Sequence, residues 1–95
     1  MTHKVQIDKT ALAFLEQLPE KNRRVVKEKL KILHDDPWPG KNGDKELLNL
    51  PDYNLYRIHI ARSYTAFYLI DNNNTTVTIL ELMTIEKAHK KYGRL

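Results

Sequence analysis

The segment from Asp52 to Gly93 constrains this chain most, because it alternates as a β-sheet requires and then changes to a basic helical pattern. Successive side chains of a strand point to opposite faces of the sheet. The first part of the segment therefore predicts a strand with an apolar face and a solvated, cationic face. The residues of the apolar face are Tyr56, Ile58 and Ile60, and those of the cationic face are Arg57 and His59.

Two further strands follow the first one. Residues 61–64 break the alternation and predict a hairpin connection, after which residues 65–70 are aromatic and β-branched enough for a strand. Residues 71–74 are the clearest turn in the chain, because Asp and Asn side chains bond their own backbone and tolerate left-handed φ. Residues 75–83 carry apolar side chains on both faces, which predicts a central strand that is covered on two sides.

The N-terminal third has the period of helices. Residues 4–7 predict a short strand, and Asp8 is placed to cap a helix over residues 9–18. Pro19 stops this helix and suits the first turn of a second one over residues 20–34. Two helices joined in this way predict an antiparallel helical hairpin that covers one face of the later sheet.

The order of these elements predicts an α+β fold. We expect one small domain over residues 1–95, in which an N-terminal strand and a helical hairpin pack on an antiparallel meander, with a short C-terminal helix. A Pro/Gly-rich loop over residues 38–44 leads into a further extended segment over residues 45–50. No apolar run approaches the ~18 residues of a transmembrane helix. There is no secretory signal and no cysteine, so a cytoplasmic location is the default.

The charge of the chain favours an anionic partner. The formal net charge is +4 and the pI is about 9.4, which suits association with nucleic acid. The outer side of the second predicted helix is especially basic. It is either a solvated face or a footprint for a phosphate backbone that continues onto the sheet. Its basic residues are Arg23, Arg24, Lys27, Lys29 and Lys31.

Two stretches make the chain resemble the RelE/ParE toxin superfamily. They are LLNLPDYNLYRIHIARSYTAFYLID over residues 47–71 and MTIEKAHKKYG over residues 83–93. The resemblance covers nearly the whole chain and rests on order, spacing and length. It implies a RelE-like toxin of a type II toxin–antitoxin system, which would cleave mRNA on the ribosome and so inhibit translation. Its partner would be a small cognate antitoxin, and the toxin alone is expected to be a monomer.

The resemblance also implies which residues form the site. Basic residues of the RelE branch lie on the first meander strand, at the positions of Arg57 and His59. Relatives often carry an arginine on the next strand where this chain has Thr65, and Arg62 in the turn is the candidate to supply the missing charge. The late basic and aromatic residues of the family correspond to three residues of the last predicted helix: Lys87, His89 and Tyr92.

These residue types suit metal-independent cleavage of RNA. Attack of a 2′-hydroxyl on the adjacent phosphate needs a base, a proton donor for the leaving oxygen, and cations where charge develops. His59 and His89 titrate closest to neutrality, and arginine can hold a phosphate bidentately. Glu46 is a further candidate for the base. The four histidines lack metal-ligand spacing, so we expect no metal or other cofactor.

Other interpretations remain beside this one. Arg57 and His59 can be ordinary polar residues of a solvated face, and Tyr92 can anchor the last helix on the core. The function then has two alternatives to the ribonuclease. One is a non-catalytic module of the same fold that binds RNA or only its antitoxin, which the threonine at position 65 favours. The other is a ParE-like inhibitor of DNA gyrase.

Overall fold

The computed structural model describes residues 2–40 and 43–93, which form three helices and one five-stranded sheet. The elements are β1 (Lys4–Ile7), α1 (Lys9–Gln17), α2 (Glu20–Asp35), β2 (Lys45–Asn49), β3 (Asn54–Ile60), β4 (Tyr64–Asp71), β5 (Thr76–Thr84) and α3 (Ile85–Tyr92). The predicted bounds agree with these to within two residues, and the predicted α+β fold class is confirmed.

The sheet has the strand order β1-β5-β4-β3-β2. Strands β2 to β5 are antiparallel neighbours, so the predicted meander is confirmed and extended by β2. β1 lies parallel to β5, with Lys4 opposite Thr76 and Ile7 opposite Ile79. Two parallel strands need a long connection between them, and α1 and α2 form the first part of the connection from β1 to β5. β5 therefore lies inside the sheet for part of its length, as the apolar side chains on both its faces predict.

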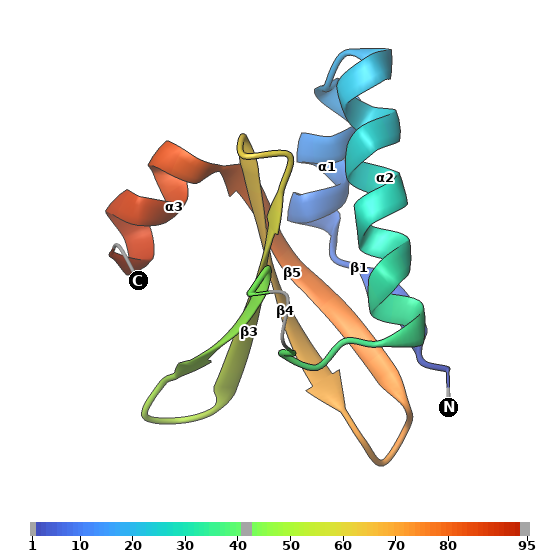
Figure 1. Ribbon diagram of the computed structural model, residues 1–95, viewed down its shortest axis with the longest axis vertical. Coiled ribbons are helices and arrows are strands. Elements are labelled where there is room, and N and C mark those ends of the chain that lie inside the picture. The colour runs from blue at the N-terminus through green and yellow to red at the C-terminus, as the bar shows by residue number, and fades with distance from the viewer. Residues whose placement is uncertain (1, 41–42, 94–95) are drawn as a thin grey trace.

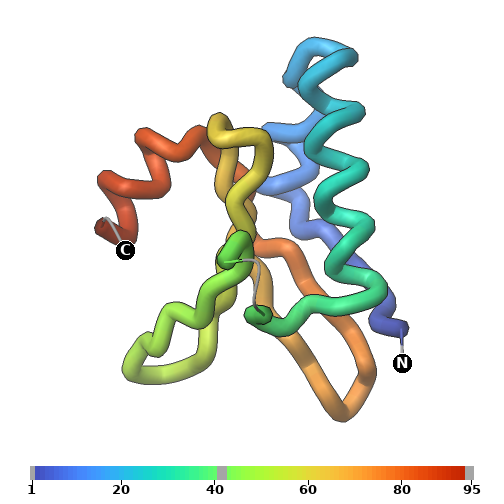
Figure 2. Tube along the Cα trace, in the orientation of Figure 1, coloured from blue at the N-terminus to red at the C-terminus, as the bar shows by residue number. Residues whose placement is uncertain are grey.

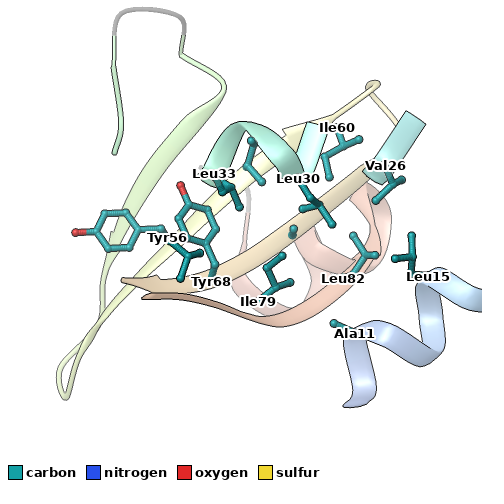
Figure 3. Packing of buried hydrophobic residues seen from close by; sticks show 13 residues of the cluster. Ala11, Leu15, Val26, Leu30, Leu33, Tyr56, Ile60, Tyr68, Ile79 and Leu82 are labelled. Carbon is teal, nitrogen blue, oxygen red and sulfur yellow. The ribbon is translucent and has the colours of Figure 1, made fainter. Parts of the chain in front are cut away.

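Helices cover both faces of the sheet, with α1 and α2 on one side and α3 on the other (Figure 1). Beneath α1 and α2 lies the larger core, to which β3 contributes Ile58 and Ile60, and β4 contributes Tyr68 (Figure 3). Helical side chains fill it from above: Ala11, Leu15, Val26, Leu30 and Leu33. Asp8 occupies the N-cap position of α1 as predicted, but its side chain makes no capping hydrogen bond, and the Asp8 carbonyl accepts from the Leu12 amide.

The opposite face carries a smaller core under α3. Its buried members are Leu48, Leu55, Phe67, Met83 and Ala88. The start of α3 is well fixed, since the Thr84 hydroxyl accepts from the Lys87 amide and the Ile85 amide donates to the carbonyl of Ser63. The tip of the β3–β4 hairpin therefore lies beside the beginning of α3 (Figure 2). No helix in the described part of the chain is long and apolar enough to cross a membrane.

Candidate functional site

Arg57 and His59 lie on the α3 side of the sheet, as the alternation along β3 predicts. The prediction that this face is solvated is wrong for Arg57, whose side chain is only 1% exposed. Its neighbours across the sheet are Glu46 on β2 and Phe67 on β4, and the Phe67 ring is covered in turn by α3. His59 stands nearer the open edge of this layer and keeps 31% of its side chain exposed.

Glu46 connects the two basic residues of β3. The Arg57 guanidinium donates to one carboxylate oxygen of Glu46 at 2.8 Å. The other oxygen lies 3.8 Å from Nε2 of His59, which is an electrostatic contact and too long for a hydrogen bond. Glu46 itself is 38% exposed, so this carboxylate reaches solvent while its arginine partner does not. The sequence marked Glu46 only as a further candidate, whereas the geometry makes it the link of the group.

The surroundings of His59 lower its pKa. Burial lowers the pKa of His59 most, and the Arg57 guanidinium and His89 lower it further, while Glu46 opposes them. His89 comes from α3, so the helix brings a second imidazole within electrostatic reach of the first. We call Glu46, Arg57, His59 and His89 the histidine cluster. Because the pKa of His59 is lowered, its imidazole is neutral at physiological pH and can accept a proton.

A second polar group, the Glu81 clamp, joins α3 to the sheet and consists of Glu81, Lys91 and Tyr92. The Tyr92 hydroxyl donates to one carboxylate oxygen of Glu81 at 2.6 Å, and the Lys91 ammonium donates to the other. Burial works to raise the pKa of Glu81, but these two hydrogen bonds and the lysine charges hold it below its ordinary value. Burial and the bond to Glu81 raise the pKa of Tyr92 far above its ordinary value. The Tyr92 ring also packs on Phe67 with the centroids 4.4 Å apart, so Tyr92 anchors α3.

The remaining predicted site residues lie around these two groups. Lys87 is close enough to Glu81 to lower its pKa, which places it beside the Glu81 clamp. Arg62 lies at the tip of the β3–β4 hairpin, beside the start of α3, with a left-handed φ of 59°. No interaction within the described ranges links Arg62 to the histidine cluster. The structure thus gathers Arg57, His59 and His89, and leaves Arg62 apart.

Thr65 lies directly between His59 and Met83 in the sheet. Its side chain is buried, and its hydroxyl has no hydrogen-bond partner among residues 2–40 and 43–93. Sequence analysis also missed Glu81 altogether. The available signal was the single charged residue inside a central strand of apolar residues and threonines. Such a residue needs a partner when that strand is covered. Over the same residues, no three histidine, aspartate or glutamate side chains gather where they could hold a metal ion.

Three solved structures of similar fold give the context for this site. The archaeal RelE–RelB complex from Pyrococcus horikoshii OT3 is 29% identical, with a TM-score of 0.73 over 88% of this chain and 96% of that chain. The toxin–antitoxin complex RelBE2 from Mycobacterium tuberculosis is 24% identical, with a TM-score of 0.74 over 88% and 99%. The isolated Escherichia coli RelE toxin is 20% identical, with a TM-score of 0.70 over 94% and 97%. The latter two are similar in fold alone.

A family model matches almost the whole fold. The model describes the ParE toxin of the type II toxin–antitoxin system parDE, and it matches residues 5–87. This range includes β2 to β5 completely, all of β1 except Lys4, and the beginning of α3. No curated protein sequence matches the chain significantly. The family match and the shared fold together lead to one conclusion: the chain belongs to the RelE/ParE family of toxins of type II toxin–antitoxin systems.

Proposed function

We propose that this toxin is a metal-independent endoribonuclease that cleaves mRNA on the ribosome, inhibits translation, and is silenced by a cognate antitoxin. The observation that carries the proposal is the histidine cluster. A second imidazole, that of His89 on α3, lies within electrostatic reach of His59, which stands beside a carboxylate that a buried arginine holds in place. A toxin that only binds its target has no need of such a set of acid–base groups.

The proposed chemistry gives each imidazole one step of the proton transfer. His59, with its lowered pKa, is neutral near pH 7 and accepts the proton of the attacking 2′-hydroxyl. A bond forms between the 2′-oxygen and phosphorus, the bond from phosphorus to the 5′-oxygen breaks, and we assign His89 to deliver a proton to that leaving oxygen. The products are a 2′,3′-cyclic phosphate and a 5′-hydroxyl.

Arg57 takes a different part from the one the sequence predicts. Its guanidinium is already held by Glu46 and lies beneath the surface, so we assign it to orienting that carboxylate beside His59. The fixed positive charge still lies close to where the phosphorane gathers negative charge, and it needs no reorganisation there. Contacts to the flanking phosphates fall to the exposed lysines of α3, Lys87 and Lys90.

The antitoxin is proposed from the relatives and from charge. The Pyrococcus horikoshii and Mycobacterium tuberculosis structures are toxin–antitoxin complexes, and the net charge of this chain is +4. We expect an acidic or amphipathic antitoxin segment that folds as it binds across α3 and the neighbouring sheet. Because Arg57 is buried, this segment meets His59 and the exposed lysines of α3 rather than the Arg57 guanidinium.

Two alternatives have an observation of their own. The matching family model describes a ParE toxin, which favours an inhibitor of DNA gyrase. The buried Thr65 hydroxyl, at a position where relatives often carry arginine, favours a module that binds without cleaving. Both alternatives leave mRNA intact on translating ribosomes.

The experiment compares the three functions directly. The wild-type chain and His59→Gln are each induced alone, the ends of cellular mRNA are mapped, and DNA supercoiling by gyrase is assayed with the purified protein. The proposal expects new mRNA ends with the wild type, few with the variant, and unchanged supercoiling with both. Intact mRNA together with inhibited supercoiling would establish the gyrase function. Intact mRNA with normal supercoiling would establish the non-catalytic module.

A further inference from the structure

Glu81, Phe67 and Arg57 stand opposite one another in a single row across β5, β4 and β3. The Glu81 clamp fastens the last turn of α3 above this row, and the histidine cluster occupies the other end of it. We propose that Glu81 is a positioning residue that holds α3, and with it His89, against His59. The inference rests on the proposed function for its catalytic consequence, while its structural part stands without it.

The need for such a residue follows from the length of α3. The helix has eight residues, and an isolated helix shorter than ~12–15 residues is marginal in water. Its first turn is fixed by the Thr84 cap and by the bond from Ile85 to Ser63. His89 comes later, where the cap has no influence. From His89 onward the polar contacts from α3 to the sheet all lead to Glu81, among the interactions that the described residues make.

The two bonds of the clamp differ in strength. Lys91 is about half exposed, and exposed ion pairs are worth little because water screens them. The bond from the Tyr92 hydroxyl runs to an ionised carboxylate whose side chain is only 23% exposed, next to the packed ring of Phe67. Hydrogen bonds to charged groups in such surroundings are about twice as strong as neutral ones. The pair of Glu81 and Tyr92 is therefore the main fastening, and Lys91 adds to it.

The pKa of His59 distinguishes a positioning role of Glu81 from a direct electrostatic one, because loss of Glu81 shifts this pKa in opposite directions in the two cases. Removing a negative charge makes the surroundings more positive, which lowers the pKa of a nearby imidazole. Releasing α3 instead moves His89 away from His59, and His89 holds the pKa of His59 down at present. The positioning role therefore predicts that the pKa of His59 rises toward the ordinary value of ~6.5 when Glu81 is lost.

The experiment measures this pKa by NMR, from the imidazole C–H shifts of His59 against pH. Glu81→Ala is the test, and Glu81→Leu, which fills the space without accepting a hydrogen bond, replaces it if the alanine variant does not fold. Glu86→Gln is the matched control, because it also removes one negative charge beside the sheet but belongs to neither polar group. We expect a higher pKa of His59 in the Glu81 variant and not in the control. A pKa that is unchanged or lower in the Glu81 variant overturns the proposal.

A second readout connects the clamp to catalysis. In a ribosome-dependent cleavage assay, loss of Glu81 is expected to lower kcat by about 10–100-fold with little change in KM, because misplaced groups cost rate more than binding. Glu81→Gln keeps an oxygen for Tyr92 and is expected to recover part of the loss. A kcat equal to wild type in Glu81→Ala overturns the proposal. If the wild type itself cleaves nothing, the proposed function fails, and the pKa of His59 still decides whether Glu81 positions α3.

Discussion

The two faces of the sheet bury their residues in different ways. On β3, Ile58 and Arg57 are adjacent in sequence and almost equally inaccessible, with side chains that are 0% and 1% exposed. Ile58 lies under α1 and α2 within a continuous apolar cluster. Arg57 lies under the α3 layer, where a smaller apolar cluster meets charged residues from three strands.

The comparison teaches that burial has a different consequence on each side. Burial of an aliphatic side chain stabilises the fold through the apolar area it removes from water, about 1.5–3 kcal/mol for a residue such as isoleucine. Burial of a guanidinium carries a desolvation cost that only good partners offset. The first face therefore holds the fold together, while the second keeps charged groups in fixed positions. Each of the following predictions probes one side of this difference.

The largest effect on stability is expected from Ile58→Ala. Loss of a fully buried aliphatic side chain and the cavity it leaves should lower the free energy of unfolding by about 2–5 kcal/mol. Ile58→Val, the matched control, should cost about 0.5–1.5 kcal/mol. Urea denaturation measures both. Cleavage per folded molecule should not change, and a specific loss of catalysis in Ile58→Val would contradict the division between the faces.

Arg57→Ala is expected to affect both activity and stability. Loss of a preorganised charge should reduce cleavage by about 10²–10³-fold, or ~2–4 kcal/mol of the barrier. Because the side chain is buried, the variant should also lose about 1–3 kcal/mol of stability, less than a fully buried pair would cost since Glu46 can return to water. Cleavage kinetics and thermal melts give the two values. Arg57→Lys, the matched control, keeps the positive charge but not the planar guanidinium. Full activity in Arg57→Ala would exclude the arginine from the mechanism.

His59 is expected to control how cleavage and stability depend on pH. Loss of the imidazole in His59→Ala should reduce cleavage by a factor of about 10², within the range of general acid–base groups. The lowered pKa also predicts that the acid limb of the wild-type pH–rate profile lies below the ~6.5 of an ordinary histidine. The free energy of unfolding should fall as pH drops from ~6.5 to the folded pKa, since the unfolded chain binds the proton first. An acid limb above 6.5 would contradict this assignment.

Tyr68→Phe is expected to lower stability less than Ile58→Ala, through a change confined to the face under α1 and α2. The Tyr68 hydroxyl donates to the carbonyl of Pro37 at 2.7 Å inside the larger core. Removing the donor leaves a buried carbonyl unpaired, which should lower the free energy of unfolding by about 1–2 kcal/mol. Chemical denaturation measures the loss. Catalysis should stay at the wild-type level, and a changed rate would show that the two faces communicate.

The smallest effect is expected at Arg62. Its φ of 59° suits glycine better than arginine, so Arg62→Gly should change stability by no more than about 1 kcal/mol, toward a gain. Arg62→Ala, the control, keeps the strain and removes the charge. Cleavage should remain within a few-fold of wild type in both, because Arg62 lies apart from the histidine cluster. A loss of about 10²-fold, the size typical of a preorganised donor, would return Arg62 to the site.

The sequence by itself determined the elements and the side of the sheet on which each residue lies. Strand alternation and helical period are local properties, so β3, its neighbours and the two N-terminal helices followed from residue order. The same alternation placed Arg57 and His59 on one face. The acid–base residue types could also be recognised, because imidazole chemistry does not depend on the fold.

Only the tertiary structure decided what covers each face. Alternation says which side a residue lies on but not which distant element packs there, so Arg57 was expected in solvent and is buried. The contact of Arg57 with Glu46 depends on the register of β2 against β3. The approach of His89 to His59, and the fastening of Tyr92 by Glu81, depend on how α3 folds back over the sheet. These contacts join residues far apart in sequence, and the free energy that selects them arises only when the elements pack.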